Sequence, residues 1–358
     1  MKIFYDHQIF SLQTYGGISR YFFELISSNM DFILSLKMTN NYYLRNKYPD
    51  KYMSFLLNYN FKGKNRIISN INKFFTNINI TKESFDIFHP TYYDIYFLDI
   101  IKNKPFVLTV YDMIHEKFKI FPNSDKISIY KQHLITKASK IITISNSTKK
   151  DLMEIYNIDE KKIQTIYLAN SISLKDKIVN IELPSKYILF VGNRGLYKNF
   201  DLFFESIREL LVNDDELCLV CVGGNKFSKN ELQKYNSHLS KRILHFNLSD
   251  NELSHFYQNA LLFVFPSLYE GFGIPILEAF ACKCPLVCSN IDPFLEIAGD
   301  GAYYFDPCDK ISIKNAVEKI INSDFLRKQL IINGEKRLKN FSWNKTVYET
   351  KKLYESLV

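Results

Sequence analysis

The sequence has no long apolar run, and it has no cysteine in its first half. No apolar stretch approaches the ~18–20 residues that a membrane-spanning helix needs, and residues 1–7 enter a strand pattern without the apolar region of a signal peptide. All six cysteines follow residue 217, and none forms a metal-ligand pattern with a nearby histidine. We therefore expect a soluble, cytoplasmic protein whose cysteines are small buried side chains rather than disulfides or zinc ligands.

Two further absences exclude classes of function. No Gly-x-Gly-x-x-Gly follows the first predicted strand, which argues against a dinucleotide-dependent oxidoreductase. The basic residues are spread out and belong to no recognisable nucleic-acid-binding module, so we expect no nucleic-acid partner. The sequence also shows no internal repeat.

Length and charge suggest two parts with different tasks. A chain of 358 residues is long enough for two domains, and its 46% apolar and 23% charged residues argue against extensive disorder. Residues 1–178 carry 25 basic and 16 acidic side chains, whereas residues 179–358 carry 21 and 22. A first half with a net charge of +9 either faces something anionic or has a solvated lysine-rich surface.

Short apolar runs alternate with amphipathic helical patterns along the chain. Strands are predicted at residues 2–5, 32–37, 86–89, 106–111, 141–144, 163–167, 187–191, 217–222, 243–246, 262–265, 286–289 and 302–305. Helices are predicted at residues 18–28, 127–138, 147–156, 200–211, 231–238, 251–259, 275–281, 311–322 and 342–357. Residues 41–83 have no clean period and are interpreted as loops with one or two short helices. The alternation predicts an α/β protein with mostly parallel, doubly wound sheets covered on both faces.

The densest set of residues suited to chemistry lies at 265–279. A buried strand ends at Phe265, a loop with Gly271 and Gly273 follows, and Pro275 suits the first helical position because its missing N–H costs nothing there. The glycines let the backbone approach a ligand closely, and the unpaired N–H groups at the helix start favour an anion.

Two carboxylates frame this loop. Glu270 precedes the turn, and Glu278 lies one turn into the helix, where its carboxylate can accept hydrogen bonds from sugar hydroxyls. A plain strand–turn–helix explains each residue singly, with Glu278 as a favourable first-turn charge. The ordered set, two glutamates separated by seven residues with Gly-Phe-Gly-x-Pro between them, resembles the donor-site signature of retaining family-4 glycosyltransferases with the GT-B fold.

Other segments resemble the same family in the same order. They are Gly-Gly-Ile-Ser-Arg-Tyr at 16–21, Thr-Ile-Ser-x-Ser at 143–147, Val-Gly-Asn-Arg-Gly-Leu-Tyr-Lys-Asn at 191–199, Asp-x-Glu-Leu at 250–253 and Phe-Ser-Trp at 341–343. The match spans nearly the whole chain and is most similar to mannosyltransferase-type members that build bacterial surface polysaccharides. It implies two Rossmann-like domains facing across a cleft, with an acceptor-side domain at 1–178, a donor domain at 179–340, and a C-terminal helix at 341–358 that packs back on the first domain.

The resemblance implies retaining transfer of a hexose from a sugar nucleotide, preferably GDP-mannose, to a saccharide or lipid-linked saccharide acceptor. Arg194 and Lys198 would neutralise the departing diphosphate; each could also be ordinary surface charge, but their place beyond a buried strand favours a site. Glu270 would face the transferred sugar and Glu278 the ribose. The backbone of Gly16, Gly17, Gly271, Phe272, Gly273 and Ile274 would approach the donor.

One segment departs from the family pattern. Tyr111-Asp112 stands where the family often has His-Asp, and His115 follows four residues after Tyr111. The resemblance implies Asp112 as an acceptor-side base and places Tyr111, His89 and His115 as candidates for the sugar pocket. A satisfied structural role is the alternative for a strand-end histidine such as His89.

No metal and no cofactor are expected, because GT-B transferases usually need no bound metal and Arg and Lys supply the positive charge. The basic first domain fits a membrane-borne, phosphate-linked acceptor, with residues 62–66 as the candidate contact at the inner face of the membrane, or else as a solvated loop. Two alternatives stay open: a sugar-nucleotide epimerase of the same fold, and a non-catalytic sugar-nucleotide-binding subunit of an assembly complex.

Overall fold

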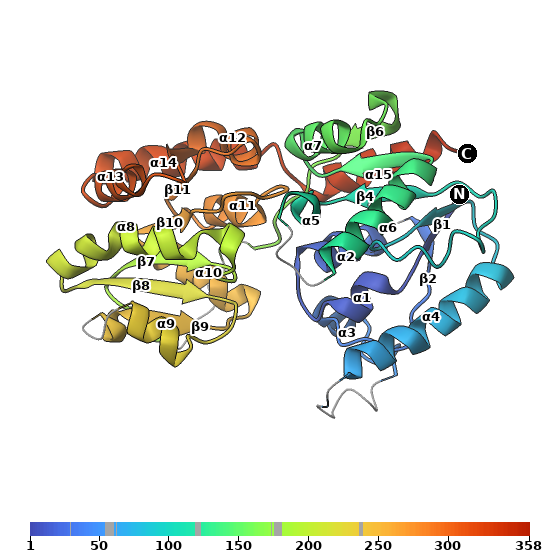
Figure 1. The fold of residues 1–358 in the computed structure, drawn as a ribbon, viewed down its shortest axis with the longest axis horizontal. Helices are drawn as coiled ribbons and strands as arrows, with labels where there is room; N and C mark the ends of the chain where they lie inside the picture. Colours follow the sequence, from blue (N-terminus) through green and yellow to red (C-terminus); the bar gives the residue numbers. More distant parts are fainter. Residues whose placement is uncertain are drawn as a thin grey trace. The chain divides into compact units, whose positions relative to one another are not determined.

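The computed structural model describes residues 1–28, 30–53, 61, 63–118, 123–172, 174, 181–235 and 239–358. The chain divides into two compact units (Figure 1), which are Met1–Leu168 with Trp343–Val358 and Ala169–Ser342. The predicted boundary between residues 178 and 179 lies outside the described residues, and the division by contacts falls earlier, after Leu168. The C-terminal helix belongs to the first unit. Each unit is described by itself below.

The first unit is built on parallel strands. They are β1 (Lys2–Tyr5), β2 (Asp31–Leu34), β3 (Ile87–His89), β4 (Val107–Val110), β5 (Lys140–Thr143) and β6 (Ile163–Thr165). They form the ladders β2-β1-β3 and β4-β5-β6, which a single parallel bridge between Phe88 and Phe106 connects. The order therefore reverses direction between β1 and β3, which is the topological switch point of a doubly wound sheet.

Helices cover the first sheet. They are α1 (Gln8–Leu12), α2 (Gly17–Ser27), α3 (Tyr42–Lys47), α4 (Lys64–Lys82), α5 (Ile114–Lys117), α6 (Ser124–Lys137), α7 (Asn146–Tyr156) and α15 (Trp343–Glu355), with a 3₁₀ turn η1 (Glu160–Lys162). The side chain of Ser145 accepts a hydrogen bond from the Thr148 N–H at 3.0 Å and so caps the start of α7. Helices α2 and α15 contact each other, which brings the C-terminal residues against an N-terminal helix.

The long helix α4 corrects the prediction for residues 41–83. Its buried positions Ile68, Asn72, Thr76 and Ile80 recur every four residues, which defines one face of a helix. Two of them are polar and hydrogen-bonded: the Asn72 amide oxygen accepts from the N–H groups of residues 37 and 38, and the Thr76 hydroxyl donates to a backbone carbonyl. Because half of the buried stripe is polar, a hydrophobic pattern could not reveal it.

The second unit contains one fully parallel six-stranded sheet in the order β12-β11-β10-β7-β8-β9. Its strands are β7 (Lys186–Val191), β8 (Leu217–Val222), β9 (Ile243–Phe246), β10 (Leu262–Phe265), β11 (Leu286–Ser289) and β12 (Ala302–Phe305). From the β9 edge this is the dinucleotide-fold order 3-2-1-4-5-6, which reverses between β7 and β10. The predicted α/β class with two Rossmann-like units is therefore confirmed.

Helices cover both faces of the second sheet. They are α8 (Phe200–Asn213), α9 (Lys229–Lys234), α10 (Asp250–Asn259), α11 (Ile274–Ala281), α12 (Asp292–Ala298), α13 (Lys310–Ile321) and α14 (Asp324–Leu338), with 3₁₀ turns η2 (Leu196–Lys198), η3 (Ser240–Arg242) and η4 (Gly299–Gly301). Successive side chains of β7 point to opposite faces of the sheet. Ile188 packs in a core with α8 and α13, whereas the next strand residue towards the N-terminus, Tyr187, donates to the Phe256 carbonyl of α10 at 2.6 Å.

The cysteines behave largely as predicted. Cys221, Cys282, Cys284 and Cys288 are buried, reduced side chains of the second unit, whereas Cys308 is exposed. Among the described residues no helix is both long and apolar enough to cross a membrane.

Candidate active site

An ion pair lies at the switch point of the second sheet. Lys198 ends the loop that follows β7, and Glu270 lies in the loop that follows β10. The Lys198 Nζ is 2.5 Å from Glu270 Oε1, and both side chains are largely buried, with 13% and 15% of their surface exposed. Ligands of open α/β sheets bind outside the carboxyl ends of the strands at this point, so the pair marks the candidate site.

The two loops are fixed to each other. The Leu268 N–H donates to the Tyr197 carbonyl at 2.8 Å, and the Ser267 hydroxyl donates to Glu270 Oε1 at 2.8 Å. Ser267 was not predicted as a site residue, because a serine beside a proline gives no signal of its own in the sequence. Its hydroxyl and the Lys198 ammonium share one carboxylate oxygen, which holds Glu270 in a single orientation.

The loop between β10 and α11 needs glycine at Gly273. Its φ of +99° lies in the left-handed region, and a Cβ there would meet the Ile276 Cδ1 atom at 2.9 Å and a ring carbon of Phe294 at 3.0 Å. Helix α11 begins at Ile274, so Pro275 occupies the second helical position instead of the predicted first. No side chain therefore stands directly before the start of α11, and the first N–H groups of the helix are suited to bind an anion.

Glu278 lies in α11 beside Tyr257, whose hydroxyl donates to Glu278 Oε2 at 3.1 Å. Burial raises the pKa of Glu278 to about 7, the Tyr257 hydrogen bond lowers it, and the nearby Asp250 carboxylate raises it further. The carboxyl group therefore titrates near neutrality, in contrast to an ordinary surface glutamate. Sequence reasoning missed Tyr257 because it comes from α10.

Arg194 binds partners other than those of Lys198. Its Nε donates to Glu231 Oε1 at 3.2 Å, its Nη2 donates to the Asn225 carbonyl at 2.8 Å, and its guanidinium lies 3.9 Å from the centroid of the Phe227 ring. The side chain is only 8% exposed. Its Nη1 is buried and has no hydrogen-bond partner among the described residues. An anionic ligand that accepted a hydrogen bond from Nη1 would remove the cost of leaving this donor unpaired.

In the first unit, His89 is part of a buried hydrogen-bond network. Its Nδ1 lies 2.5 Å from the Tyr354 hydroxyl, and its Nε2 lies 2.9 Å from the Thr109 hydroxyl. The Tyr354 hydroxyl also lies 3.1 Å from that of Tyr5. Burial lowers the pKa of His89 to about 3, so the ring is neutral. His89 is fully buried and both of its ring nitrogens have hydrogen-bond partners, which suits the structural role that was the alternative for this residue; its place in a sugar pocket stays a prediction.

Tyr111 follows β4 and is buried, and burial raises the pKa of its phenol well above the usual value. Its N–H donates to the Tyr93 hydroxyl at 3.2 Å, whereas its own hydroxyl has no partner among the described residues. His115 is half-buried, its Nδ1 lies 3.2 Å from the Ser124 hydroxyl, and burial lowers its pKa. Tyr111 thus has a buried hydroxyl without a hydrogen-bond partner among the described residues.

The Asp112 segment is anchored by a buried lysine that the sequence did not reveal. Lys131 of α6 is fully buried; its Nζ donates to the Asp112 carbonyl at 2.9 Å and pairs with Glu116 Oε2 at 2.9 Å. The Asp112 Oδ1 accepts from the Ile114 N–H at 3.0 Å, which caps the start of α5. A lysine inside a helical pattern predicts a solvated face, so only the tertiary structure shows its role.

The first glycine loop starts α2. Gly16 is the residue before the helix and has an extended backbone, and Gly17 is the first helical residue. The Gln13 side-chain oxygen accepts from the Ser19 N–H at 3.1 Å, so one N–H of the first turn already has a partner. No group of three or more His, Cys, Asp or Glu side chains among the described positions is arranged to hold a metal ion.

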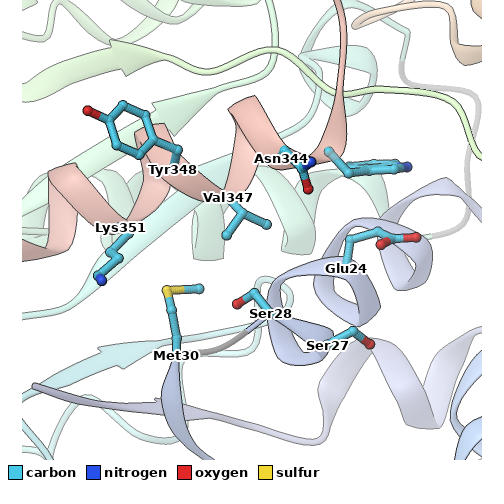
Figure 2. A pocket seen from close by; sticks show the side chains of 9 residues that line it. Glu24, Ser27, Ser28, Met30, Asn344, Val347, Tyr348 and Lys351 are labelled. Atoms are coloured by element: carbon cyan, nitrogen blue, oxygen red, sulfur yellow. The ribbon is translucent and has the colours of Figure 1, made fainter.

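A separate cavity of about 430 Å³ lies between α2 and α15 (Figure 2). Val347 of α15 points towards Ser28 at the end of α2, with Met30 beneath, and Glu24 and Tyr348 also line the cavity. None of the residues predicted for the site lines this cavity, so it is not the site that the sequence motifs indicate.

Comparison with known proteins agrees with this fold. Residues 54–169 match the family described as Glycosyltransferase Family 4, and residues 171–337 match that described as Glycosyl transferases group 1. The fold resembles sucrose-phosphate synthase from Thermosynechococcus elongatus, with a TM-score of 0.77, 17% identity and coverage of 100% and 99% of the two chains. It also resembles Anabaena HepE in complex with UDP-glucose, with a TM-score of 0.73, 14% identity and coverage of 99% and 100%. The fold is that of the GT-B glycosyltransferases.

Sequence relatives give the family. An uncharacterized glycosyltransferase of Methanocaldococcus jannaschii is 30% identical over 267 residues, covering 72% of this chain and 71% of that protein. The O-antigen chain mannosyltransferase RfbU of Salmonella typhimurium is 33% identical over 56% of this chain, and O-antigen chain mannosyltransferase B of Escherichia coli is 28% identical over 62%. These matches span 57% and 61% of the two mannosyltransferases. The chain belongs to glycosyltransferase family 4.

Proposed function

We propose that this protein is a retaining glycosyltransferase that moves a hexose, preferably mannose, from a nucleoside-diphosphate sugar to a saccharide or lipid-linked saccharide during surface-polysaccharide synthesis. The observation that carries the proposal is the Lys198–Glu270 pair at the switch point of the second sheet, beside the start of α11. The preference for mannose rests on the two O-antigen mannosyltransferases among the relatives.

The chemistry of the second unit suits a departing diphosphate. When the bond between sugar and phosphate breaks, negative charge develops on the phosphate oxygens, and preorganised positive groups stabilise it. Lys198, the unpaired Nη1 of Arg194 and the first N–H groups of α11 supply such groups. Glu270 would then bind hydroxyls of the transferred sugar, and Glu278 those of the ribose. No step of this scheme assigns charge neutralisation to a metal ion.

Asp112 and Tyr111 of the first unit are proposed to act on the acceptor, whereas the residues above act on the donor. Asp112 is held by its backbone, and its carboxylate would take the acceptor proton. Tyr111 would use its unsatisfied hydroxyl as a hydrogen-bond partner. Asp112→Asn keeps the size of the side chain and removes its basicity. A loss of turnover without a change in donor affinity would support the base role, and unchanged turnover would refute it.

The decisive experiment measures nucleotide release from GDP-mannose, GDP-fucose, UDP-glucose and UDP-N-acetylglucosamine, with and without an added mannoside acceptor. A transferase releases nucleotide in proportion to a new glycoside, and the anomeric configuration of that product, read by NMR, tests retention. Acceptor-independent rearrangement of the donor sugar would instead indicate an epimerase. Donor binding without any turnover would indicate a non-catalytic binding subunit.

A contact with an anionic membrane surface is also proposed for the first unit. Lys62 of the candidate segment lies outside the described residues, but Arg66 is exposed near the start of α4. On the same helix Ile67 and Phe74 are 45% and 63% exposed and lie seven positions apart, hence on one face. Basic and apolar side chains together suit a membrane interface.

Co-sedimentation with phosphatidylglycerol vesicles tests this contact. An Ile67→Ser/Phe74→Ser variant should bind such vesicles less than the wild type, whereas Phe325→Ser, at an exposed position of the second unit, should bind equally. Equal sedimentation of all three proteins, or none for the wild type, would refute the contact and would leave the proposed transferase activity untouched.

A further inference from the structure

The first unit contains a second cavity, of about 280 Å³, which no motif in the sequence indicates. It lies between the segments that follow β1 and β3, helix α4 and the beginning of α6. Its lining includes Gln8, Tyr92, Tyr93, Asp94, Asn123 and Tyr130. None of these residues takes part in the site of the second unit.

The position of this cavity in the fold is that of a ligand site. Gln8 comes shortly after β1, and Tyr92 comes shortly after β3. These two strands are the neighbours between which the order of the first sheet reverses. The cavity therefore lies outside the carboxyl ends of the strands at the switch point, the place where open α/β sheets bind small molecules.

Hydrogen bonds between the segments that form its walls hold this cavity in shape. The Gln8 side-chain oxygen accepts from the Asp94 N–H at 2.7 Å, and its amide nitrogen donates to the Asp94 carbonyl at 3.1 Å and to Asp6 Oδ2 at 2.7 Å. Asp6 is fully buried and also accepts from the N–H of Thr91 at 2.9 Å. The loop after β3 is thereby fixed to the loop after β1, so the walls of the cavity keep their places without a ligand.

The lining combines aromatic rings with polar groups. The rings of Tyr92 and Tyr93 lie 4.7 Å apart, and Tyr130 contributes a third ring from α6. Aromatic faces carry negative partial charge and attract the C–H bonds of a sugar ring, while amide, carboxylate and phenol groups bind its hydroxyls. Burial raises the pKa of Tyr92 to about 12, so its hydroxyl stays protonated and able to donate at neutral pH.

The charges around the cavity and its volume limit the class of ligand that it can bind. Asp94 Oδ2 lies 3.0 Å from Lys73 Nζ, and Lys126 Nζ lies 5.2 Å from the centroid of the Tyr130 ring, so charges of both signs occur around the cavity. This mixture favours a neutral ligand over a phosphate. The volume falls just below the roughly 300 Å³ at which pockets for drug-sized ligands begin, which suits a single ring better than a nucleotide.

We propose that this cavity binds one neutral pyranose ring of a saccharide, with Tyr130 as a stacking wall and the Tyr92–Asp94 segment as the hydroxyl-binding wall. The assignment of this ring to the acceptor rests on the proposed transferase function. The binding of a sugar ring in the cavity is independent of that function, because it can be measured without donor and without turnover.

Saturation-transfer NMR with methyl α-D-mannopyranoside and methyl α-D-glucopyranoside tests the site on the full chain. The wild type should give a signal with at least one glycoside. Tyr130→Ala should weaken binding at least tenfold, whereas Tyr130→Phe, which keeps the ring, should bind within about twofold of the wild type. Tyr348→Ala is the matched control, because Tyr348 belongs to the same unit and lines the other cavity. Thermal unfolding of each variant identifies any that fails to fold, and Tyr92→Ala replaces such a variant.

Kinetics then separate this proposal from the proposed function. In a transferase, Tyr130→Ala should raise the acceptor KM at least tenfold and leave the donor KM and acceptor-independent donor hydrolysis unchanged. Glycoside binding that Tyr130→Ala removes, in a protein that transfers no sugar, would refute the proposed function and support this site. Equal glycoside binding by the wild type and Tyr130→Ala, or no binding by the wild type, would overturn the site.

Discussion

Lys198 and Glu270 hold each other at 2.5 Å from loops that follow two neighbouring strands, β7 and β10. The pair is largely buried, so each charge depends on the other for compensation. A diphosphate that enters the site would add negative charge beside Lys198 and compete with Glu270 for its ammonium. The pair therefore holds the lysine ammonium in position before a donor binds.

Replacement of Lys198 should impair the reaction with the sugar nucleotide more than it impairs folding. We predict that Lys198→Met lowers kcat/KM for the sugar nucleotide by roughly 100-fold or more, since a preorganised positive group at the departing phosphate is lost. Initial rates of nucleotide release measure this. The control is Lys310→Met, which removes an exposed lysine of α13 that lies 4.0 Å from Glu205. Equal rates for Lys198→Met and the wild type would contradict the assigned role.

Glu278 should make the stability of the protein depend on pH near neutrality. Its pKa is raised to about 7 in the folded protein, so the folded state binds the proton more tightly than the unfolded state does. The stabilising contribution is complete below about pH 4 and is lost as pH rises through about 7. Glu278→Gln cannot ionise, so it should be more stable than the wild type at pH 8, by at most about 3 kcal/mol, and less so at pH 5.

Urea unfolding at pH 5, 6, 7 and 8 checks this dependence. Glu216→Gln, at an exposed position of the second unit, should show the same small difference from the wild type at every pH. A difference between Glu278→Gln and the wild type that does not change with pH would show that Glu278 titrates in its ordinary range.

The buried network around His89 should contribute to stability through the hydroxyl of Tyr354. Tyr354→Phe removes the partner of His89 Nδ1 and of the Tyr5 hydroxyl, and it leaves polar atoms unpaired in the core. A loss of about 1–3 kcal/mol in the free energy of unfolding is expected. Tyr348→Phe, in the same helix but 57% exposed, should change it by less than about 0.5 kcal/mol. Chemical denaturation of both variants measures the difference.

Lys131 should be more costly to replace than any surface lysine. Lys131→Met leaves Glu116 buried without its cation and should destabilise the protein by roughly 3–5 kcal/mol. The double variant Lys131→Met/Glu116→Gln removes both charges and should recover part of that loss. A double variant less stable than the single one would show that Glu116 is stabilised by other groups, such as the Tyr156 hydroxyl that donates to its Oε1 at 3.0 Å.

The strands of the second unit could be predicted closely, because they are short apolar runs bounded by turns. Strands β8 to β12 have the predicted bounds, because each is a short apolar run; β10 and β11 are buried at every position, whereas the edge strands β9 and β12 are partly buried. Helix α4 was missed because Asn72 and Thr76 occupy its buried stripe, and α14 was not predicted because it buries little more than Leu330 and Gly334. Periodicity identifies an element only when its buried face is apolar.

The residues of the site, like the helices and strands, could be predicted only where a sequence pattern marks them. The motif spacing indicated Lys198, Glu270 and Glu278, because residues at the ends of neighbouring parallel strands meet at one edge. The partners that fix these residues, Ser267 and Tyr257, could not be found, since single hydroxyls carry no pattern. Arg194 was expected with Lys198, yet the aromatic ring and carboxylate that hold it come from more than thirty residues further along the chain.

The C-terminal helix has a consequence for how the chain is made. Tyr354 bonds residues 265 and 349 positions earlier, so the second unit is in effect inserted between the two segments of the first. During synthesis the inserted unit has its complete sequence before the unit that precedes it does. The core around His89 closes only after residues Trp343–Val358 have left the ribosome, so a chain without these residues would leave the polar groups of Tyr5 and His89 uncovered beside the N-terminal sheet.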